Sequence, residues 1–438
     1  MSTNAAMPGL KVSENRRYLV TEDGEPFFWL GDTAWELFHR STREEADHYL
    51  RNRAERGYTV IQAVGLAEFG GLTKPNAYGR VPLLRSADGA FDPSAPDTAA
   101  EPGGYSYWDH VDYVVDKAAE LGLYIALLPT WGDKYHIAWG EGPDIFAPDN
   151  ARTYGRWLGE RCRDRSNVIW VLGGDRALTQ RRHFEIVNAM AEGLAEGDGG
   201  RHLRTFHPMG GRSSSRHVHD EPWLDFNMIQ SSHGLGEQSN HMLVAADYAR
   251  TPVKPTLEAE PCYEDHPRGF NPVNGYFDEA DVRKAAYYGV LAGGLGITYG
   301  HHCVWSLNTE PTSTFIMTWK QAILRPGAAQ MRHVRTLAES RPMLERVPDQ
   351  SLLAANEEGA NYAVAARGER HAFLYSPNGL ALRAAMGRIA GEEVDASWFD
   401  PRTGETTAIG RFPNAGETTF LPPQAGRGRD WVLVLDAV

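Results

Sequence analysis

The chain has 438 residues, of which 42% are hydrophobic and 11% aromatic, a composition typical of a folded protein with more than one small core. Its net charge of −13 argues against nucleic-acid binding, which requires a basic face, and no run of about 18 apolar residues is present to cross a membrane. The first twenty residues lack a basic segment followed by an apolar one, and Cys162, Cys262 and Cys303 have no metal-like spacing. These features predict a reduced, cytoplasmic protein.

Strands and helices alternate along the first three quarters of the chain. Apolar, β-branched runs predict eight strands, at residues 27–35, 59–64, 124–132, 168–175, 203–208, 226–233, 255–261 and 296–302. Apolar residues at helical spacing predict helices at residues 42–56, 107–121, 148–163, 180–195, 240–250 and 278–292. Thr42 and Glu45 have the spacing of a capping box at the start of the first of these helices.

Eight strands that alternate with helices predict an α/β fold, a closed (β/α)8 TIM barrel over residues 1–342 with a short β segment at its N-terminal end. The alternative is an open, doubly wound sheet. Such a sheet would carry a glycine-rich phosphate turn after its first strand, and Gly31-Asp32-Thr33 lacks the three-glycine spacing. No cofactor is expected.

The sequence pattern changes after Pro342. Short alternating segments between Asn-Gly and glycine-rich turns predict a small antiparallel β-sandwich over residues 343–438. Its strands are expected within residues 361–367, 371–377, 395–405 and 430–436, with hairpin turns at 377–379 and 402–405. We expect this domain to pack on the side of the barrel through apolar residues and to add nothing to an active site.

Polar functional groups stand at nearly every predicted strand end. The stretch VIWVLGGDR (168–176) runs from a buried strand across two glycines into Asp175, and the glycines let a substrate or a neighbouring backbone approach closely. Active sites of (β/α)8 barrels lie at the carboxyl ends of the strands. Carboxylates, imidazoles, amides and indoles that converge there are typical of a carbohydrate site, because they hold hydroxyls and stack on sugar rings. The candidate substrate-binding residues are Asp32, Trp35, Gln62, Glu68, Trp131, Asp133, Lys134, Arg176, His207, Gln230, His233, Glu258, His301, His302 and Trp305.

Hydrolysis of a glycosidic bond requires two carboxyl groups, one protonated and one ionised. Asp175 and Glu260 are the best pair, because strands four and seven of an eight-stranded barrel face each other obliquely across its mouth. Their carboxyl groups should lie about 5–5.5 Å apart if the anomeric configuration is retained, and about 6.5–9.5 Å apart if it is inverted. Glu258 has the same facing as Glu260 one layer deeper, and it is expected to hold a substrate hydroxyl or tune Glu260.

Each of these residues also has a structural interpretation. A strand-end aspartate is commonly a helix N-cap, adjacent histidines can be satisfied rim residues, and tryptophans can be packing residues. The His and Asp residues show no ligand spacing such as H-x-x-x-H, so no metal is expected. The alternatives to one particular exo-glycosidase are therefore a glycosidase of different sugar specificity and a catalytically inert carbohydrate-binding protein on the same fold. The sugar depends on loops such as 65–106 and 209–222, and the oligomeric state, a homo-oligomer included, is left open.

Several long motifs resemble the apiosidase-type family of glycoside hydrolases. They are GDTAWELFHR (31–40), IQAVGLAEFGGLTKPNAYG (61–79), PTWGDK (129–134), VIWVLGGDR (168–176), TFHPMGGRSSS (205–215), DEPWLDFNMIQSSH (220–233), LEAEPCYED (257–265), YGHHCVW (299–305), FDPRTGE (399–405) and the terminal DWVLVLD. The resemblance covers nearly the whole chain. It implies a metal-free, exo-acting, retaining enzyme that removes a terminal sugar, apiose or a related furanose or pyranose, from a small glycoside or oligosaccharide. By position, the family's catalytic pair falls on Asp175 as general acid/base and Glu260 as nucleophile.

Overall fold

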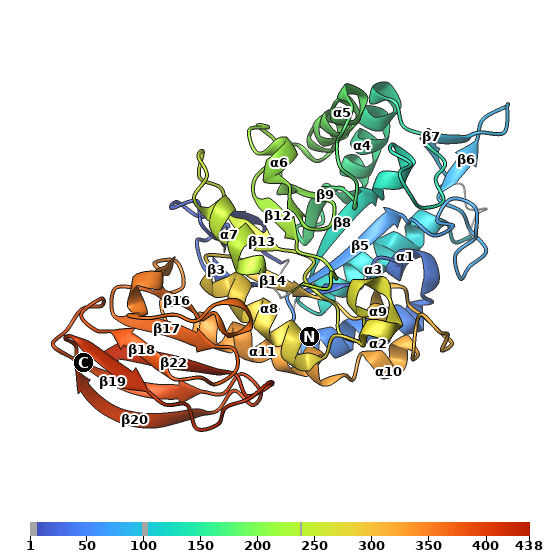
Figure 1. Ribbon diagram of the computed structural model, residues 1–438. Coiled ribbons are helices and arrows are strands. Elements are labelled where there is room, and N and C mark those ends of the chain that lie inside the picture. Colours follow the sequence, from blue (N-terminus) through green and yellow to red (C-terminus); the bar gives the residue numbers. More distant parts are fainter. Residues whose placement is uncertain (1–6, 99–103, 237–238) are drawn as a thin grey trace, which may run out of the picture.

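The computed structural model describes residues 7–98, 104–236 and 239–438, and it consists of a barrel of parallel strands followed by a smaller antiparallel β domain (Figure 1). The fold class predicted from the sequence is confirmed. The prediction that the first twenty residues lack a leader pattern falls partly on residues 1–6, which lie outside the described residues. Residues 99–103 of the 65–106 loop also lie outside them.

Eight strands among the described residues run parallel to one another and form the barrel wall. In chain order they are β4 (Trp29–Thr33), β5 (Val60–Leu66), β8 (Tyr124–Thr130), β9 (Val168–Gly173), β10 (Arg204–His207), β12 (Asn227–Gln230), β13 (Thr256–Glu258) and β14 (Gly296–Tyr299). β14 pairs with β4, and β10 meets β12 where the Asp225 N–H donates to the Arg204 carbonyl. β11 (Arg212–Ser213) adds an antiparallel edge to β12. The carboxyl ends of the eight strands therefore open on one side of the barrel.

Helices surround the barrel, and several begin at the capping residues that the sequence indicates. They are α1 (Leu37–Arg40), α2 (Arg43–Glu55), α3 (Tyr107–Glu120), α4 (Pro148–Cys162), α5 (Arg181–Asp198), α6 (Ser215–Val218), α7 (Asn240–Tyr248), α8 (Glu279–Leu291), α9 (His302–Trp305), α10 (Trp319–Ala322) and α11 (Pro326–Glu339). The Thr42–Glu45 capping box of α2 is present, and Asp278 caps α8. The six predicted helices form, whereas α1, α6, α9, α10 and α11 were not predicted. No helix in the described part of the chain is long and apolar enough to cross a membrane.

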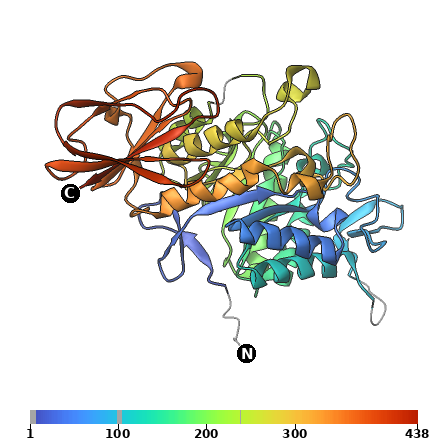
Figure 2. The same cartoon turned by 90° about the horizontal axis from the view of Figure 1, so that it is seen from below.

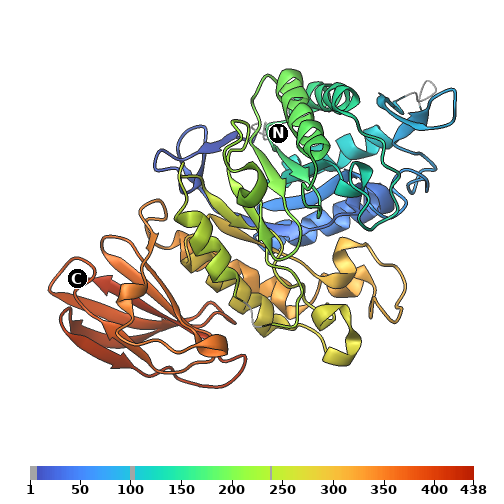
Figure 3. The ribbon, with the colours of Figure 1, turned by 45° about the horizontal axis from the view of Figure 1, so that its top comes forward.

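Six of the barrel strands, β4, β8, β9, β12, β13 and β14, end two or three residues earlier than their apolar runs predict. β13 stops at Glu258 and β14 at Tyr299, so Glu260 and His301 stand on the loops that follow. The predicted first strand is divided at Phe28 into β3 (Pro26–Phe27) and β4. The 65–106 loop carries an unpredicted hairpin, β6 (Leu83–Arg85) and β7 (Phe91–Pro96), which projects on the side of the barrel away from the C-terminal domain (Figure 3).

Antiparallel sheets flank the barrel at both ends of the chain. The N-terminal sheet consists of β1 (Leu10–Val12), β2 (Leu19–Thr21) and β3. The C-terminal domain has a six-stranded sheet in the order β15–β16–β17–β22–β19–β20 and a two-stranded sheet of β18 and β21. These strands are β15 (Val347–Pro348), β16 (Val364–Arg367), β17 (His371–Ser376), β18 (Leu382–Ala385), β19 (Glu393–Phe399), β20 (Thr406–Pro413), β21 (Glu417–Phe420) and β22 (Trp431–Ala437).

The two predicted hairpin turns of this domain have different outcomes. The turn at 402–405 joins β19 to β20, which pair as predicted. The prediction of a hairpin at 377–379 is wrong, because β17 pairs with β22 and β18 pairs with β21, so this turn carries the chain from one sheet to the other. Gly379 has a φ of +65°, and a Cβ there would lie 2.2 Å from the Gln424 carbonyl oxygen, so the turn requires glycine for the crossing.

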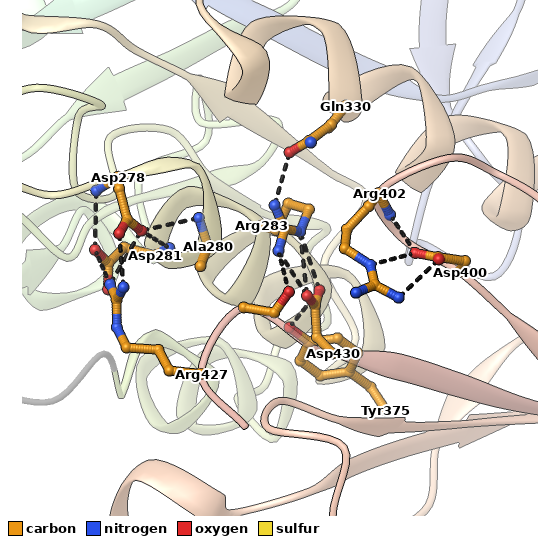
Figure 4. Close-up of polar contacts among 11 residues, drawn as sticks. Asp278, Ala280, Asp281, Arg283, Gln330, Tyr375, Asp400, Arg402, Arg427 and Asp430 are labelled. Carbon is orange, nitrogen blue, oxygen red and sulfur yellow. Dashed lines mark hydrogen bonds and ion pairs between the residues drawn. The ribbon is translucent and has the colours of Figure 1, made fainter. Parts of the chain in front are cut away.

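The C-terminal domain packs against α8 and α11 on one side of the barrel (Figures 1 and 2). Apolar contact is present, as expected: the Tyr287 and Tyr375 rings stack with their centroids 4.9 Å apart. The interface also contains a buried ion pair that the sequence did not indicate, in which Nη2 of Arg283 lies 2.7 Å from Oδ1 of Asp430 (Figure 4). Gln330 of α11 accepts a further hydrogen bond from Arg283 at 2.7 Å, so the buried guanidinium joins both helices to the β domain.

Candidate active site

A cavity of about 600 Å³ lies at the carboxyl ends of the barrel strands. Its lining residues are Trp35, Glu68, Phe69, Trp131, Trp139, Asp175, Met209, Gly210, Gly211, Gln230, Ser231, Ser232, His233, Gly234, Glu260, Tyr263, His266, Phe270 and Trp305. Trp35 and Trp131 are nearly fully buried at the closed end, whereas Trp139 is 44% and Phe270 69% exposed at the mouth. No described residue beyond Trp305 lines this cavity, in agreement with the expectation that the C-terminal domain does not enter it.

Three consecutive residues at the end of β9 have left-handed backbone conformations. The φ angles of Gly173, Gly174 and Asp175 are +94°, +107° and +58°. A Cβ on Gly173 would lie 2.4 Å from the His207 carbonyl oxygen, and one on Gly174 would lie 2.7 Å from the Gly132 amide nitrogen. Glycine is therefore required at both positions, and the resulting turn directs Asp175 into the cavity. A non-glycine residue held at positive φ stores strain, which is typical of functional sites.

The environment of Asp175 favours its protonated form. Burial, followed by the neighbouring charge of Glu260, raises the pKa of Asp175 to about 6, although His207 and Arg176 oppose the shift. Its side chain is 23% exposed to the cavity. Asp175 can therefore hold a proton near neutral pH and deliver it to a bound molecule.

The environment of Glu260 favours the opposite form. Burial by itself would raise the pKa of Glu260, but the imidazoles of His207 and His233 lower it well below the usual range of a carboxyl group. Nε2 of His233 lies 3.2 Å from Oε1, and Nε2 of His207 lies 3.0 Å from Oε2 without the alignment of a hydrogen bond. Glu260 is therefore an ionised carboxylate in a buried site.

The proton on His233 can be placed from its neighbours. The backbone N–H of Tyr263 donates to Nδ1 of His233 at 3.3 Å, so Nδ1 is an acceptor and the ring proton is on Nε2. Nε2 therefore donates to Glu260 from a neutral imidazole. His266 shows the complementary arrangement: its Nδ1 lies 2.7 Å from the Pro267 carbonyl oxygen, which can only accept, so its Nε2 is free to accept a hydrogen bond.

Glu258 lies beneath Glu260 and is fully buried. Burial raises the pKa of Glu258 to about 8, although the Ser231 backbone, whose N–H donates to Oε1 at 3.3 Å, opposes the shift. At neutral pH Glu258 is therefore uncharged, in contrast to Glu260 two residues later.

A third carboxyl group, Glu68, lines the cavity on the side of β9. Its Oε1 accepts a hydrogen bond of 2.6 Å from Arg176, and Arg176 also donates to the Trp139 carbonyl at 2.7 Å. Burial raises the pKa of Glu68 to about 7, although Arg176 opposes the shift. The Arg176 guanidinium is fully buried and lies 4.0 Å from the centre of the Trp139 ring. It therefore holds this ring in place at the mouth of the cavity.

The structure brings about half of the predicted site residues together. Besides the Asp175–Glu260 pair, the cavity wall contains Trp35, Glu68, Trp131, Gln230, His233 and Trp305. His207, Glu258 and Arg176 lie directly behind these residues and contact them. Nε1 of Trp131 and Oε1 of Gln230 are buried atoms of the wall that have no hydrogen-bond partner among the described residues, and they are therefore placed to bind a polar molecule.

The remaining predicted site residues lie outside the cavity, because other parts of the protein pair with them. Asp32 forms a fully buried ion pair with Arg53 of α2, with Nε and Oδ2 2.6 Å apart, and it accepts a hydrogen bond from Tyr49. Lys134 donates to the adjacent Asp133 at 2.8 Å, and both are fully buried. These charged groups support the fold behind the rim.

Three further predicted residues are also held away from the cavity. Gln62 donates to the Ala259 carbonyl at 3.1 Å. His301 contacts Asp265 at 3.0 Å and accepts the Cys303 N–H as the cap of α9. His302 stacks on Phe315 with the ring centroids 4.6 Å apart. The interpretation as a satisfied rim residue therefore fits His301, whereas Nε2 of His302 is buried without a hydrogen-bond partner among the described residues.

Several wall residues were not predicted, because they stand on loops beyond the strand ends. Tyr263, His266 and Phe270 follow Glu260 in the stretch YEDHPRGF, and Trp139 lies in the loop before α4. The density of aromatic residues directly after a candidate carboxylate was a signal that could have identified the first three. Among the described residues, no three His, Cys, Asp or Glu side chains come together as a metal site.

Two solved structures that share this architecture are described as glycoside hydrolases. A glycoside hydrolase family 5 protein from Bacteroides vulgatus is 33% identical over 98% of this chain and 93% of its own, with a TM-score of 0.89. A second structure, described as a glycoside hydrolase, is 33% identical over 98% of this chain and 97% of its own, with a TM-score of 0.90. The barrel and these similarities define the protein as a glycosidase.

Family profiles cover almost the entire chain. Residues 13–345 match "Apiosidase-like, catalytic domain", and residues 347–436 match "Putative collagen-binding domain of a collagenase". The chain belongs to the apiosidase-like family. The resemblance noted from the sequence motifs is thereby confirmed. Among curated proteins, no sequence matches the chain.

Proposed function

We propose that the protein is an exo-acting, retaining glycosidase that removes one terminal neutral sugar, apiose or a related furanose or pyranose, from a small glycoside or oligosaccharide. The observation that carries this proposal is the pairing of Asp175 and Glu260 at one cavity with pKa values displaced in opposite directions. One group is ready to donate a proton while the other is ready to carry negative charge.

The state of Glu260 favours a nucleophile over a general base. A general base acts best when its pKa lies near the working pH, whereas the pKa of Glu260 is well below that range. A carboxylate of this kind is poorly suited to take a proton from water, but it can attack an anomeric carbon or stabilise its positive charge. The low pKa of Glu260 therefore supports retention of the anomeric configuration.

The proposed reaction has two steps. Glu260 attacks the anomeric carbon and forms a bond to it, while the bond to the leaving oxygen breaks and Asp175 gives its proton to that oxygen. Asp175, now ionised, then takes a proton from a water molecule, and the resulting hydroxide displaces Glu260 from the sugar. His233, a neutral donor, keeps the Glu260 carboxylate in position throughout.

The cavity favours an uncharged sugar. Glu68, Asp175 and Glu260 line it, and none of its described lining residues is Lys or Arg. The nearby Arg176 is buried and engaged with Glu68 and the Trp139 carbonyl. A uronic acid or a sugar phosphate would bring negative charge next to carboxylates without a free cation. Trp131 Nε1, Gln230 Oε1 and His266 Nε2 are available instead for neutral hydroxyl groups.

Exo action is supported by the shape of the site. The cavity is closed at one end by Trp35 and Trp131 and open at the end with Trp139 and Phe270. A volume of about 600 Å³ is that of a pocket for one small ligand. A terminal sugar fits such a closed end, with its leaving group directed toward the mouth.

The test uses nitrophenyl glycosides of neutral furanoses, including apiose, and of neutral pyranoses, with matched glucuronides as the charged control. We expect one neutral sugar to be cleaved and the uronides to be inert. Proton NMR of the first product should show the anomer of the substrate. Cleavage of uronides in preference to neutral sugars, or release of the opposite anomer, would contradict the proposal. An oligosaccharide blocked at its terminal sugar should resist cleavage.

The cytoplasmic location predicted from the sequence is part of the same proposal and would direct the enzyme to small imported glycosides. Cys162, Cys262 and Cys303 are all buried and unpaired, which suits a reducing compartment. Fractionation of cells that express the protein tests the location, and recovery of the enzyme outside the cytoplasm would contradict it.

A further inference from the structure

One wall of the cavity comes from a narrow hairpin loop between β13 and α8, residues 265–277. The Asp265 N–H donates to the Phe277 carbonyl at 2.9 Å, and the Arg268 N–H donates to the Gly275 carbonyl at 3.0 Å. The chain therefore runs out toward the cavity mouth and returns to the start of α8 beside its own outgoing strand.

The side chains of this loop face the substrate cavity. His266 and Phe270 both line it, and Phe270 is held at a φ of +62° with 69% of its surface exposed. The Gly269 N–H donates to the His233 carbonyl at 2.8 Å, which ties the loop tip to the neighbouring wall. The orientation of the loop therefore decides where an exposed aromatic ring meets a ligand.

The base of the loop is held by a carboxylate that the two domains share. Nη2 of Arg268 lies 2.6 Å from Oδ2 of Asp281, and Nη2 of Arg427, from the C-terminal domain, lies 2.9 Å from the same oxygen. Arg427 also donates to Oδ2 of Asp278 at 2.6 Å (Figure 4). Arg427 therefore neutralises the two carboxylates at the start of α8, one of which anchors the loop.

The segment that carries Arg427 is itself fixed to the barrel. Three residues further along, Asp430 forms the buried ion pair with Arg283, which follows Asp278 by five residues and Asp281 by two. The Gly428 carbonyl between them accepts a hydrogen bond from Arg283 at 3.4 Å. Residues 427–430 thus hold the N-terminal part of α8 at three positions, Asp278, Asp281 and Arg283.

We propose that Arg427 is a positioning residue for the substrate cavity, acting through Asp281 and Arg268 on the 265–277 loop. The C-terminal domain then influences the leaving-group side of the site without entering it. Without Arg427, Asp281 has one cation fewer and the base of the loop is less constrained, so Phe270 and His266 lose their fixed positions. Asp175 and Glu260 stand on other segments, and His233, which the loop contacts, is also held by the Tyr263 N–H outside the loop, so the chemical step should be less affected than substrate affinity. The expectation for substrate affinity rests on the proposed glycosidase function, whereas the expectation for the loop does not.

The test compares Arg427→Gln with Arg411→Gln in the full-length protein. Arg411 is a matched control, because it makes two hydrogen bonds to Asp395, at 2.9 and 3.0 Å, and is similarly half-exposed in the same domain. In hydrogen exchange read by mass spectrometry, residues 265–277 should exchange several-fold faster in Arg427→Gln only. With the nitrophenyl glycoside that the enzyme cleaves, KM should rise about three- to tenfold while kcat changes less than about twofold, since half-exposed ion pairs are of moderate strength. Arg427→Lys should show an intermediate KM.

Equal exchange of the 265–277 loop in the two variants would overturn the proposal, as would an unchanged KM in Arg427→Gln. A fall in kcat with KM constant would also overturn it, because the residue would then affect the chemistry instead of the leaving-group side. Should the proposed function itself fail, no nitrophenyl glycoside would be cleaved by the parent enzyme, and the exchange measurement would still decide the role of Arg427.

Discussion

The rim of the barrel has two halves that look alike in the sequence and differ in their electrostatics. At the ends of β4, β8 and β14, charged groups already have partners within the protein; the pairs are Asp32 with Arg53, Asp133 with Lys134, and His301 with Asp265. At the ends of β9, β10, β12 and β13, the side chains converge on one cavity; they are Asp175, His207, Gln230 and Glu260.

The difference shows what makes a strand-end carboxyl group reactive. Asp32 has an internal cation, so its charge is neutralised within the fold. Glu260 is held by imidazoles, of which His233 is neutral. Burial and the charge of Glu260 raise the pKa of Asp175 to about 6, and both carboxyl groups face the cavity. Substitutions in the cavity half should therefore lower activity, whereas substitutions in the paired half should lower the stability of the fold.

The largest effect is expected from Glu260→Gln, which keeps the shape of the side chain and removes its charge. Turnover should fall on the order of 10⁴-fold or more, because a covalent route loses its nucleophile. Sugar binding, measured by calorimetry, should persist because the tryptophans of the wall remain. Retention of most of the activity would place the nucleophile elsewhere.

Asp175→Asn removes the proton donor and should lower kcat/KM by about 10²- to 10⁴-fold for substrates with poor leaving groups. Nitrophenyl glycosides, which need little protonation, should lose less at the step that forms the covalent intermediate. In the parent enzyme, kcat/KM should fall as the pH rises through about 6, because Asp175 then loses its proton. The variant should lack this limb of the pH profile, and an identical limb in both proteins would contradict the assignment.

Asp32→Asn tests the paired half of the rim, where stability should suffer instead of catalysis. The change leaves Arg53 buried without its counter-charge, so the free energy of unfolding should fall by about 3–5 kcal/mol. The folded fraction should keep its KM. Asp47→Asn, which breaks the exposed pair with Arg51 on α2, is the matched control and should cost less than about 1 kcal/mol in denaturant titrations. A selective loss of kcat in Asp32→Asn would move Asp32 into the catalytic half.

Among the carboxyl groups at or beneath the cavity, Glu258→Gln should have the smallest effect on activity, less than about tenfold, because Glu258 is already uncharged at neutral pH. Its pKa is raised from 4.5 to about 8, so its contribution to stability is present below about 4.5 and is lost as the pH rises toward 8. The glutamine variant lacks this loss. The melting temperature of the variant should therefore rise relative to that of the parent as the pH increases from 5 to 9. Parallel melting curves across this range would show that Glu258 is not buried and neutral.

The sequence predicted the barrel and the catalytic candidates because both depend on local patterns. Eight apolar runs identified the strands, and the two glycines before Asp175 marked a strand end where the chain needs special backbone geometry. Which strand-end charges are neutralised could not be predicted, because Arg53 is 21 residues from Asp32 and nothing local to Asp32 indicates that Arg53 will face it across the wall. The aromatic density after Glu260 marks Phe270 as a candidate, but the place of its ring at the cavity mouth could not be predicted, since it depends on a loop fixed by distant residues.

The Arg283–Asp430 pair has a consequence for how the polypeptide is made. The two residues are 147 positions apart, and Asp430 lies close to the C-terminal end of the chain. A chain emerges from the ribosome N-terminal end first, so α8 is synthesised well before the segment that supplies the counter-charge of its Arg283. Docking of the β domain therefore does two things at once: it buries the Arg283 guanidinium and provides the carboxylate that balances it.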